Sequence, residues 1–386
     1  AVFALTEKYD AASLDSLAVS PGEIEAAEAS LDTNQRDAID LAIGNVRAFH
    51  EAQSPEPITV TTMPGVNCER RHHAIESVGL YVPAGTAPLP SAAIMLAVPA
   101  TLAGCPTRIL CTPPRPDGKA DPAVVFAAVR AGVRRIFKIG GAQAIAAMAY
   151  GTETVPNVSK LFGPGNAWVT SAKTQVSADP RGAAIDMPAG PSEVLVLADD
   201  SASPEFVAAD LLSQAEHGTD SQVILVTTSH TLAVDVVRQI ESQLASLGRA
   251  DIARAAIAAS RAIVVDDLET AVEVSNTYAP EHLIVQTRSP RELLDSIRNA
   301  GSVFLGQWTP ESVGDYCSGT NHVLPTYGFA RTYSGLGLDQ FLRSMTVQEL
   351  TSEGLRSLGG AVVTLAGMEG LDAHAAAVTR RLETVS

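Results

Sequence analysis

The chain has 386 residues, of which 46% are hydrophobic and only 5% are aromatic. A chain of this length can bury sizeable cores and ordinarily folds into two or three domains. Its formal net charge of −16 argues against nucleic acids and anionic membranes as partners, because Lys and Arg form no patch that could displace counterions. The composition therefore predicts a soluble globular protein.

The cysteines and the N-terminal residues bear on where the protein works. None of the four cysteines forms a C-x-x-C pair, which favours a reducing compartment, the cytoplasm, without disulfides. Charges interrupt the N-terminal stretch, and no segment reaches the ~18 uninterrupted apolar residues of a membrane span. We therefore expect neither a signal peptide nor a membrane segment. The chain starts without Met and within a predicted helix, so we expect that an N-terminal piece precedes it.

The apolar periodicity divides the chain into helical and alternating parts. Residues 22–53 have the pattern of helices, beginning after the capping sequence Ser20-Pro-Gly-Glu23. From Ser77 onward, short apolar runs alternate with helical patterns, which is typical of βαβ units and a parallel sheet. The first such series covers 78–82, 91–103, 108–111, 122–131, 135–139 and a helix from Ala142. The second covers 193–198, a helix ending at His217, 222–227, 232–247, 262–266, 268–276 and 283–286.

These two series predict an α/β fold with two Rossmann-like (incomplete) parallel-sheet domains. One domain comprises residues 1–80 and 192–336, and the other comprises residues 81–191. From about Gly337 the strand signals disappear, so residues 337–386 are predicted to form a helical C-terminal tail.

Three glycine-containing loops of the first series could meet a nucleotide. Lys138-Ile-Gly-Gly-Ala-Gln143 and Phe162-Gly-Pro-Gly-Asn166 each end a strand and open a helix, which offers backbone N–H groups and a positive helix end to an anion. The amides of Gln143 and Asn166 can bond a ribose or an amide. In a third loop Tyr81 could stack on a base, although an aromatic residue in a strand is more often core. An ordinary βα turn explains each loop as well, because the G-x-G-x-x-G pattern is absent.

A second group of side chains could hold a metal. Gln214 and His217 are three residues apart near the end of a helix and therefore share one face. A histidine that simply caps the helix is the alternative. With Asp315 and His374 they form a mixed nitrogen and oxygen set suited to zinc or a neighbouring divalent ion. Cys317 could approach such a metal, although thiolate would make the site softer than the other residues suggest.

Groups that can move protons also concentrate in the second half. Glu281 and His282 follow Pro280, which fixes their direction, although an adjacent Glu-His pair is often structural. Asp315 and His322 flank a polar turn of the kind found at the mouths of sites. Ser192 follows a tight turn and could meet a polar ligand or merely cap.

Five motifs together resemble histidinol dehydrogenase, and the resemblance runs over essentially the whole chain. The motifs are Phe162-Gly-Pro-Gly-Asn-Ala-Trp168, Ala189-Gly-Pro-Ser-Glu-Val-Leu195, Ser213-Gln-Ala-Glu-His-Gly218, Ala279-Pro-Glu-His-Leu283 and Val313-Gly-Asp-Tyr-Cys-Ser-Gly-Thr-Asn-His-Val-Leu-Pro-Thr326. The resemblance implies a zinc enzyme that oxidises L-histidinol to L-histidine with two NAD, by way of the aldehyde. Cys317 departs from it, since a smaller residue is expected there.

The resemblance also assigns residues. It implies one zinc per subunit, held by Gln214, His217, Asp315 and His374. It places Tyr81, Gln143 and Asn166 where NAD is contacted, so that residues 81–191 become the NAD-binding domain. The substrate-contacting positions are Ser192, Gln214, His217, His282, Asp315, His322, Glu369 and His374. Most of the metal and catalytic residues then lie in the other α/β domain.

The implied chemistry divides the work between two neighbours. Neutral His282 is the base that takes the hydroxyl proton while hydride leaves carbon. Glu281 activates the water that must add to the aldehyde before the second oxidation. Zinc fixes the orientation of the substrate through its imidazole and amine.

The tail is expected to act on a second subunit. A short helical appendage usually buries its apolar face on another body, and the resemblance implies that this body is the partner in a homodimer with shared active sites. The apolar residues concerned are Leu365, Leu371, Val378 and Leu382.

Two other classes of protein remain open from the residues alone. A zinc-dependent hydrolase or deaminase would use the same histidine and carboxylate set but has no use for the glycine loops. A catalytically silent nucleotide-binding protein would keep the loops but needs neither the Glu-His pair nor the metal ligands.

Overall fold

The computed structural model describes residues 1–84, 87–187 and 190–384. Two predicted features include residues outside the described ranges. These residues are Gly85 and Thr86 in the loop after Tyr81, and Ala189 in the Ala-Gly-Pro-Ser motif. The chain forms two compact units. The first comprises Ala1–Gln53 and Ile75–Phe341, and the second comprises Ser54–Ala74 and Leu342–Ser386.

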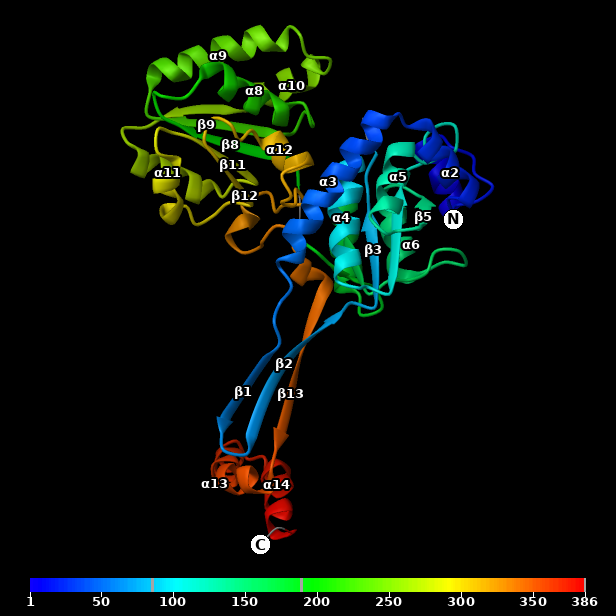
Figure 1. The fold of residues 1–386 in the computed structure, drawn as a ribbon, viewed down its shortest axis with the longest axis vertical. Helices are drawn as coiled ribbons and strands as arrows, with labels where there is room; N and C mark the ends of the chain where they lie inside the picture. Colours follow the sequence, from blue (N-terminus) through cyan, green and yellow to red (C-terminus); the bar gives the residue numbers. More distant parts are fainter. Residues whose placement is uncertain (85–86, 188–189, 385–386) are drawn as a thin grey trace. The chain divides into compact units, whose positions relative to one another are not determined.

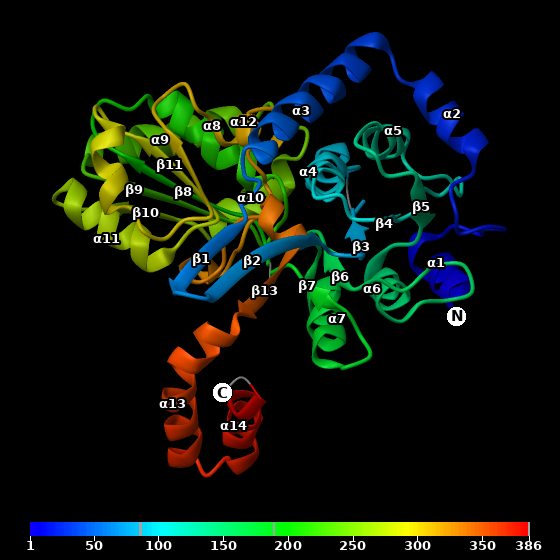
Figure 2. The ribbon, with the colours of Figure 1, turned by 60° about the horizontal axis from the view of Figure 1, so that its bottom comes forward.

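The first unit contains two parallel five-stranded sheets, and the first of these has the strand order β5-β4-β3-β6-β7. Its strands are β3 (Ser77–Tyr81), β4 (Thr107–Thr112), β5 (Arg135–Lys138), β6 (Lys160–Phe162) and β7 (Ala184–Ile185). Helices α4 (Pro90–Leu102) and α5 (Pro122–Arg130) cover one face, and α6 (Gly141–Tyr150) and α7 (Ala167–Ala178) cover the other (Figures 1 and 2). The chain runs outward through β4 and β5 and then returns to the far side of β3, so the strand order reverses between β3 and β6.

The second sheet has the order β10-β9-β8-β11-β12 and therefore reverses between β8 and β11. Its strands are β8 (Glu193–Ala198), β9 (Gln222–Thr227), β10 (Arg261–Val264), β11 (His282–Gln286) and β12 (Ser302–Leu305). Helices α8 (Pro204–Ala215), α9 (His230–Leu244) and α10 (Ala250–Ala258) lie on one face, and α11 (Leu268–Tyr278) lies on the other (Figure 1).

The central strand β8 shows why this sequence forms a sheet covered on both faces. All six of its residues are buried. Val194 and Val196 pack into the core beneath α8 and α9, whereas Leu195 and Leu197 face the opposite core beside α11. A continuous apolar run is the pattern of a parallel strand that has helices on both sides.

The N-terminal helices belong to the first unit. Helix α1 spans Val2–Asp10, α2 spans Pro21–Ser30 and α3 spans Thr33–Glu51. Both α2 and α3 begin with a capping box, formed by Ser20 with Glu23 and by Asp32 with Gln35. The remaining short elements are η1 (Pro290–Ser296), α12 (Glu311–Tyr316), η2 (Phe329–Arg331) and η3 (Leu338–Phe341).

The second unit combines an antiparallel sheet with a helical hairpin. The sheet has the order β1-β2-β13, with β1 at Ile58–Met63, β2 at Val66–Ala74 and β13 at Leu342–Leu350. Helices α13 (Ser352–Met368) and α14 (Asp372–Thr384) follow. The prediction that 337–386 is purely helical was wrong for β13. Most of its side chains are exposed, so the strand carries no apolar alternation that a sequence pattern could reveal.

The predicted fold class is confirmed. Both expected βαβ series form parallel sheets, and their strands lie within one or two residues of the predicted bounds. Among the described residues, no helix combines the length and the apolar character that a membrane span needs. The finer division of the first unit at residues 81 and 192 stays a prediction.

Candidate functional site

The end of helix α8, which carries the predicted metal ligand Gln214, lies at one edge of the second sheet. The Ser203 side chain caps the start of α8, and the helix ends at Ala215 beside the amino ends of β8 and β11. Gln214 is fully buried there, whereas His217 lies just beyond the helix with an exposed side chain. The Ser192 hydroxyl lies 3.3 Å from His217 Nδ1. The predicted Gln214, His217 and Ser192 are therefore brought together.

Asp315 joins this group from α12, and it brings a residue that the sequence analysis missed. His217, Glu311 and Asp315 each offer one ligand atom, and these atoms lie within 4.8 Å of one another. Glu311 and Asp315 are four residues apart, which places both carboxylates on one helix face. That spacing is visible in the sequence, where Glu311 precedes Asp315 by one helical turn.

The unpaired oxygens of this cluster fit a cation. Glu311 Oε2 and Asp315 Oδ1 are buried and have no hydrogen-bond partner among the described residues. Buried carboxylates are costly unless they are paired or coordinate a metal. The histidine nitrogen and carboxylate oxygens are donors that suit zinc.

The Gln214 amide lies at the centre of the cluster. Its neighbours are satisfied when its nitrogen donates to Glu311 Oε1 at 2.6 Å and its oxygen accepts from His282 Nδ1 at 3.3 Å. The structure has the opposite orientation, in which the amide nitrogen donates to the Glu193 carbonyl oxygen at 3.3 Å and lies 3.3 Å from His282 Nδ1. The amide oxygen, which is the atom a metal would bind, therefore faces Glu311, and a cation between these two oxygens would satisfy both.

Glu281 and His282 stand at the start of β11, held by the neighbouring strand β8. His282 Nδ1 donates to the Glu193 carbonyl oxygen at 3.0 Å, and Glu281 Oε2 accepts from the Glu193 N–H at 2.9 Å. Both residues are buried. With Nδ1 occupied, His282 Nε2 faces Asp315 Oδ1 at 3.5 Å and has no hydrogen-bond partner in the part of the chain that the structure describes. The atom available for proton transfer is therefore Nε2.

The electrostatics of the pair differ from the sequence expectation. Burial raises the pKa of Glu281 to about 8. For His282, burial lowers the pKa, but the carboxylates of Glu281, Asp315 and Glu311 together outweigh it and raise the pKa to about 10. The sequence predicts a neutral imidazole, whereas these carboxylates favour the protonated ring. A divalent cation among the same carboxylates would oppose that effect.

His322 connects the second sheet to the first. Its ring contacts the backbone of Ser91 in the first turn of α4, and its Nε2 has no hydrogen-bond partner within residues 1–84, 87–187 and 190–384. The preceding Asn321 donates from Nδ2 to the Met95 carbonyl oxygen at 2.8 Å. Since α4 follows β3, these contacts place the polar turn between Asp315 and His322 against the carboxyl edge of the first sheet.

The residues predicted to contact NAD gather where the strand order of the first sheet reverses. Tyr81 ends β3, and its hydroxyl accepts from the Gly141 N–H at 2.9 Å. Only 3% of Tyr81 is exposed, so most of its ring packs in the core. Asn166 caps α7 by accepting from Trp168 N–H and Val169 N–H, each at 3.1 Å. Ligands of open α/β sheets bind at such reversal points, outside the carboxyl ends of the strands.

The remaining predicted positions lie in the second unit. Glu369 caps the end of α13, and His374 lies in the first turn of α14. Both side chains are exposed on this chain.

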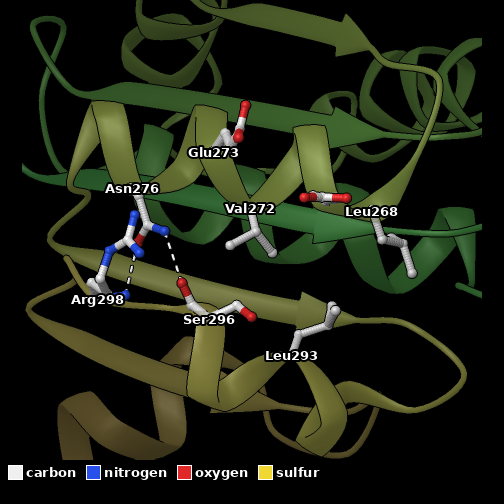
Figure 3. Close-up of a pocket in the computed structure, with 8 residues that line it drawn as sticks. Leu268, Val272, Glu273, Asn276, Leu293, Ser296 and Arg298 are labelled. Carbon is white, nitrogen blue, oxygen red and sulfur yellow. Dashed lines mark hydrogen bonds between the residues drawn. The ribbon is translucent and has the colours of Figure 1, made fainter.

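A separate hollow between α11 and η1 carries no comparable chemistry (Figure 3). Its volume is about 380 Å³, and Asn276 and Arg298 are among the residues that line it. Asn276 donates to the Ser296 carbonyl oxygen at 2.9 Å and accepts from the Arg298 N–H at 2.7 Å. Its amide is thus used to join backbone segments.

The fold and the site together define the class of protein. The chain has the parts of an α/β enzyme. One parallel sheet has glycine loops near its reversal point, and the other has a buried Glu-His pair beside two carboxylates that each have one unpaired oxygen among the described residues. The family model for histidinol dehydrogenase matches residues 1–382. The chain belongs to the histidinol dehydrogenase family and is therefore an oxidoreductase of histidine biosynthesis that oxidises histidinol.

Individual relatives agree with this assignment. The chain is 58% identical over 385 residues to histidinol dehydrogenase of Aliivibrio fischeri, covering 100% of this chain and 87% of the relative. It is also 58% identical over 383 residues to that of Vibrio cholerae, covering 99% and 88%. The crystal structure of histidinol dehydrogenase from Elizabethkingia anophelis superposes with a TM-score of 0.97 at 48% identity, covering 100% of this chain and 88% of that chain.

Proposed function

We propose that the chain oxidises L-histidinol to L-histidine by way of the aldehyde, with zinc and two NAD, in the cytoplasm. The observation that carries this proposal is the convergence at one edge of His282 Nε2, the unpaired oxygens of Glu311 and Asp315, and His217. A base and a cation site that lie side by side suit an alcohol bearing nitrogen donors. The four free cysteines are in keeping with a reducing compartment.

On this chain, the residues that would hold the metal are His217, Asp315 and Gln214. His374 of the partner subunit is the fourth. When bound, zinc supplies a positive charge that orients the imidazole and amine of histidinol. Ser192, His322 and Glu369 complete the substrate contacts, the last from the partner chain. Among these, Ser192 already lies beside His217, and His322 Nε2 makes no hydrogen bond to any of the described residues.

The first oxidation removes a proton and a hydride from the alcohol. His282 accepts the hydroxyl proton at Nε2, because Nδ1 is engaged by the Glu193 carbonyl oxygen. NAD bound at the carboxyl edge of the first sheet would supply the hydride acceptor. For His282 to act as this base its pKa must fall from the value that the surrounding carboxylates impose, and a cation bound to Asp315 acts in that direction.

The second oxidation requires water. Glu281 takes a proton from a water molecule as the water oxygen adds to the aldehyde carbon, and His282 returns the proton from the first oxidation to the aldehyde oxygen, which gives the gem-diol. His282 then takes a hydroxyl proton while the second hydride leaves the carbon, and the resulting carboxylic acid loses its proton to give the carboxylate of histidine. Glu281 is held for this step by its hydrogen bond from the Glu193 N–H, 2.9 Å long. Fixing a catalytic group in this way reduces the entropy that the transition state must lose.

The cofactor site that we propose comprises Tyr81, Gln143 and Asn166. Tyr81 positions the Gly141 loop through its hydroxyl. Gln143 lies in the first turn of α6 and Asn166 at the start of α7, where the positive helix ends face the same edge. A hydrolase or deaminase would not need a cofactor site at this edge of the first sheet.

The test is to incubate the purified protein with L-histidinol and NAD, with and without prior treatment with a chelator. We expect NAD reduction that depends on histidinol, is abolished by chelation and returns when zinc is added. NAD reduction at an unchanged rate in metal-free protein would contradict the zinc assignment.

A further inference from the structure

A buried ion pair lies behind the proposed cofactor loop. Lys173 of α7 pairs through Nζ with Asp186 Oδ1, just after β7. The side chains are 6% and 0% exposed, so both charges are removed from water. Burial of two charges is costly and rarely adds stability compared with a hydrophobic pair of the same size. Such a pair therefore calls for an explanation other than stability.

The ion pair holds one residue, Gly163, from both sides. Lys173 Nζ donates to the Gly163 carbonyl oxygen at 2.9 Å, and Asp186 Oδ2 accepts from the Gly163 N–H at 2.7 Å. Asp186 Oδ1 also accepts from the Met187 N–H at 2.7 Å. Every polar group of the pair is thus directed at the backbone of two segments, the loop after β6 and the segment after β7.

Gly163 is also the point where that loop comes closest to β3. Its φ is +124°, and a Cβ there would lie 2.1 Å from the Tyr81 carbonyl oxygen. Only glycine fits this approach. Tyr81 in turn binds the Gly141 loop through its hydroxyl. Both loops proposed to meet NAD are therefore fixed relative to β3, one of them by the ion pair.

Asp186 has a second connection, along the chain. Six residues after it, Ser192 lies beside His217 in the metal cluster. The Asp186 carboxylate therefore binds both the loop that precedes Asn166, through Gly163, and the start of the segment that leads to Ser192, through Met187. Hydride transfer requires the cofactor and the substrate carbon to be aligned closely.

We propose that Lys173 and Asp186 are positioning residues for NAD. They act through Gly163, without touching the cofactor, by holding the Gly163–Asn166 loop in the conformation that binds NAD. This inference rests on the proposed cofactor site. It predicts that loss of the ion pair weakens NAD binding while zinc and histidinol binding are retained.

The test compares Lys173→Met with Arg181→Met in the zinc-loaded enzyme. Arg181 and Asp179 form an exposed ion pair in the same part of the chain, with 3.2 Å between their atoms, so Arg181→Met is a matched control. The dissociation constant of NADH is measured by fluorescence titration, together with KM for NAD, KM for histidinol and zinc content. We expect Lys173→Met to raise the NADH dissociation constant and KM for NAD by about tenfold or more. KM for histidinol and the zinc content should not change, and Arg181→Met should behave like the unmodified protein.

A second variant covers the case in which Lys173→Met does not fold. Asp186→Asn keeps the size of the side chain and one oxygen acceptor, and we expect it to weaken NADH binding in the same direction. Unchanged NADH affinity in a folded variant of either residue would overturn the inference, as would equal losses of NADH, histidinol and zinc binding.

Variants of the proposed cofactor site distinguish an error in the positioning role from an error in the cofactor site itself. If Asn166→Ala and Gln143→Ala weaken NADH binding and Lys173→Met does not, the cofactor site stands and the positioning role is wrong. If all of these variants bind NADH normally, the cofactor site is wrong and the inference falls with it.

Discussion

Glu281 and His282 are neighbours in the sequence, but the fold gives them different surroundings. Glu281 is held through Oε2 by a backbone N–H, whereas His282 is held through Nδ1 and presents Nε2 to Asp315. Glu281 therefore lies beside the imidazole that we propose as the base, and the imidazole of His282 faces the proposed metal ligands. This difference supports separate roles in the two oxidations.

The first prediction separates those roles. Glu281→Gln should slow the oxidation of added histidinaldehyde by about 10²-fold or more and the first hydride step much less, because only the second oxidation needs water to be deprotonated. His282→Asn should slow both steps by about 10²–10⁴-fold. Single-turnover measurements of NADH formation from histidinol and from histidinaldehyde check this. Equal effects of Glu281→Gln on both steps would contradict the division.

A second prediction concerns the metal ligands. Metal analysis of the purified protein should give about one zinc per chain, and His217→Asn should lose it together with the activity. The fold should survive, because the ligands come from distant segments of an already large core. Circular dichroism and zinc content measured on the same sample check this, with exposed His230→Asn as the control. A zinc-free His217→Asn enzyme with normal turnover would show that the site is wrongly assigned.

The sequence motifs identified only part of the residues at this site. The motifs identified His217, Asp315 and Ser192, and the structure brings these three together. Glu311 was missed, because a single glutamate at a helix start has many ordinary explanations. The orientation of the Gln214 amide could not be predicted either, since it depends on Glu311 and Glu193, which lie on other elements.

Helix α8 is held against β11 by a buried polar contact. Gln286 Nε2, at the end of β11, donates to Asp210 Oδ2 at 2.6 Å. Burial raises the pKa of Asp210 to about 7. The contact lies one helical turn before Gln214, so it aligns the helix that carries the proposed metal ligands with the strand that carries His282.

The third prediction follows from the raised pKa of Asp210. The folded protein binds this proton more tightly than the unfolded chain, whose aspartates titrate near pH ~4. The contribution of Asp210 to stability is therefore greatest below pH ~4 and is lost as the pH rises towards ~7. Asp210→Asn should remove this loss and increase the free energy of unfolding at pH ~8 by about 1–3 kcal/mol, with little change at pH ~4.

Chemical denaturation at several pH values tests this, with Asp200→Asn as the control because Asp200 is 74% exposed. The variant should keep its zinc, since Asn at position 210 can still accept from Gln286. A difference between the variant and the unmodified protein that does not depend on pH would contradict the role assigned to the Asp210 carboxyl.

Elements could be predicted from the sequence only where burial imposed a pattern. Strands β8, β9 and β11 have continuous apolar runs because helices cover both of their faces, and all three were predicted. Strands β1 and β13 are largely exposed and gave no signal. Strands β6 and β7 have three and two residues, which is too short for any period to appear.

At the scale of the whole molecule, the second unit leaves apolar side chains exposed. Leu365 and Leu371 are 60% and 40% exposed. The other two predicted apolar residues, Val378 and Leu382, instead lie next to Gly359 of α13 and help join α13 to α14. The exposed leucines near Glu369 and His374 in the sequence support our proposal that this unit serves a partner chain in a homodimer.

The fourth prediction tests the shared site. His282→Asn and His374→Asn should each be inactive alone. If His374 completes the site of the partner subunit, one site of every mixed dimer collects both lesions and the other collects none. Random mixing should therefore restore about a quarter of wild-type sites. Absence of recovered activity, with subunit exchange confirmed by mass spectrometry, would place His374 in the site of its own chain.

The central claim is a four-electron oxidation at one site, and it is tested most directly by counting NADH formed per histidinol consumed. A limiting amount of L-histidinol is incubated with excess NAD and the zinc-loaded enzyme until absorbance is constant, and free aldehyde is trapped and assayed in parallel. Our account predicts two NADH per histidinol with little free aldehyde, because Glu281 and His282 complete the second oxidation before the aldehyde leaves. One NADH per histidinol, with aldehyde accumulating in solution, would contradict it.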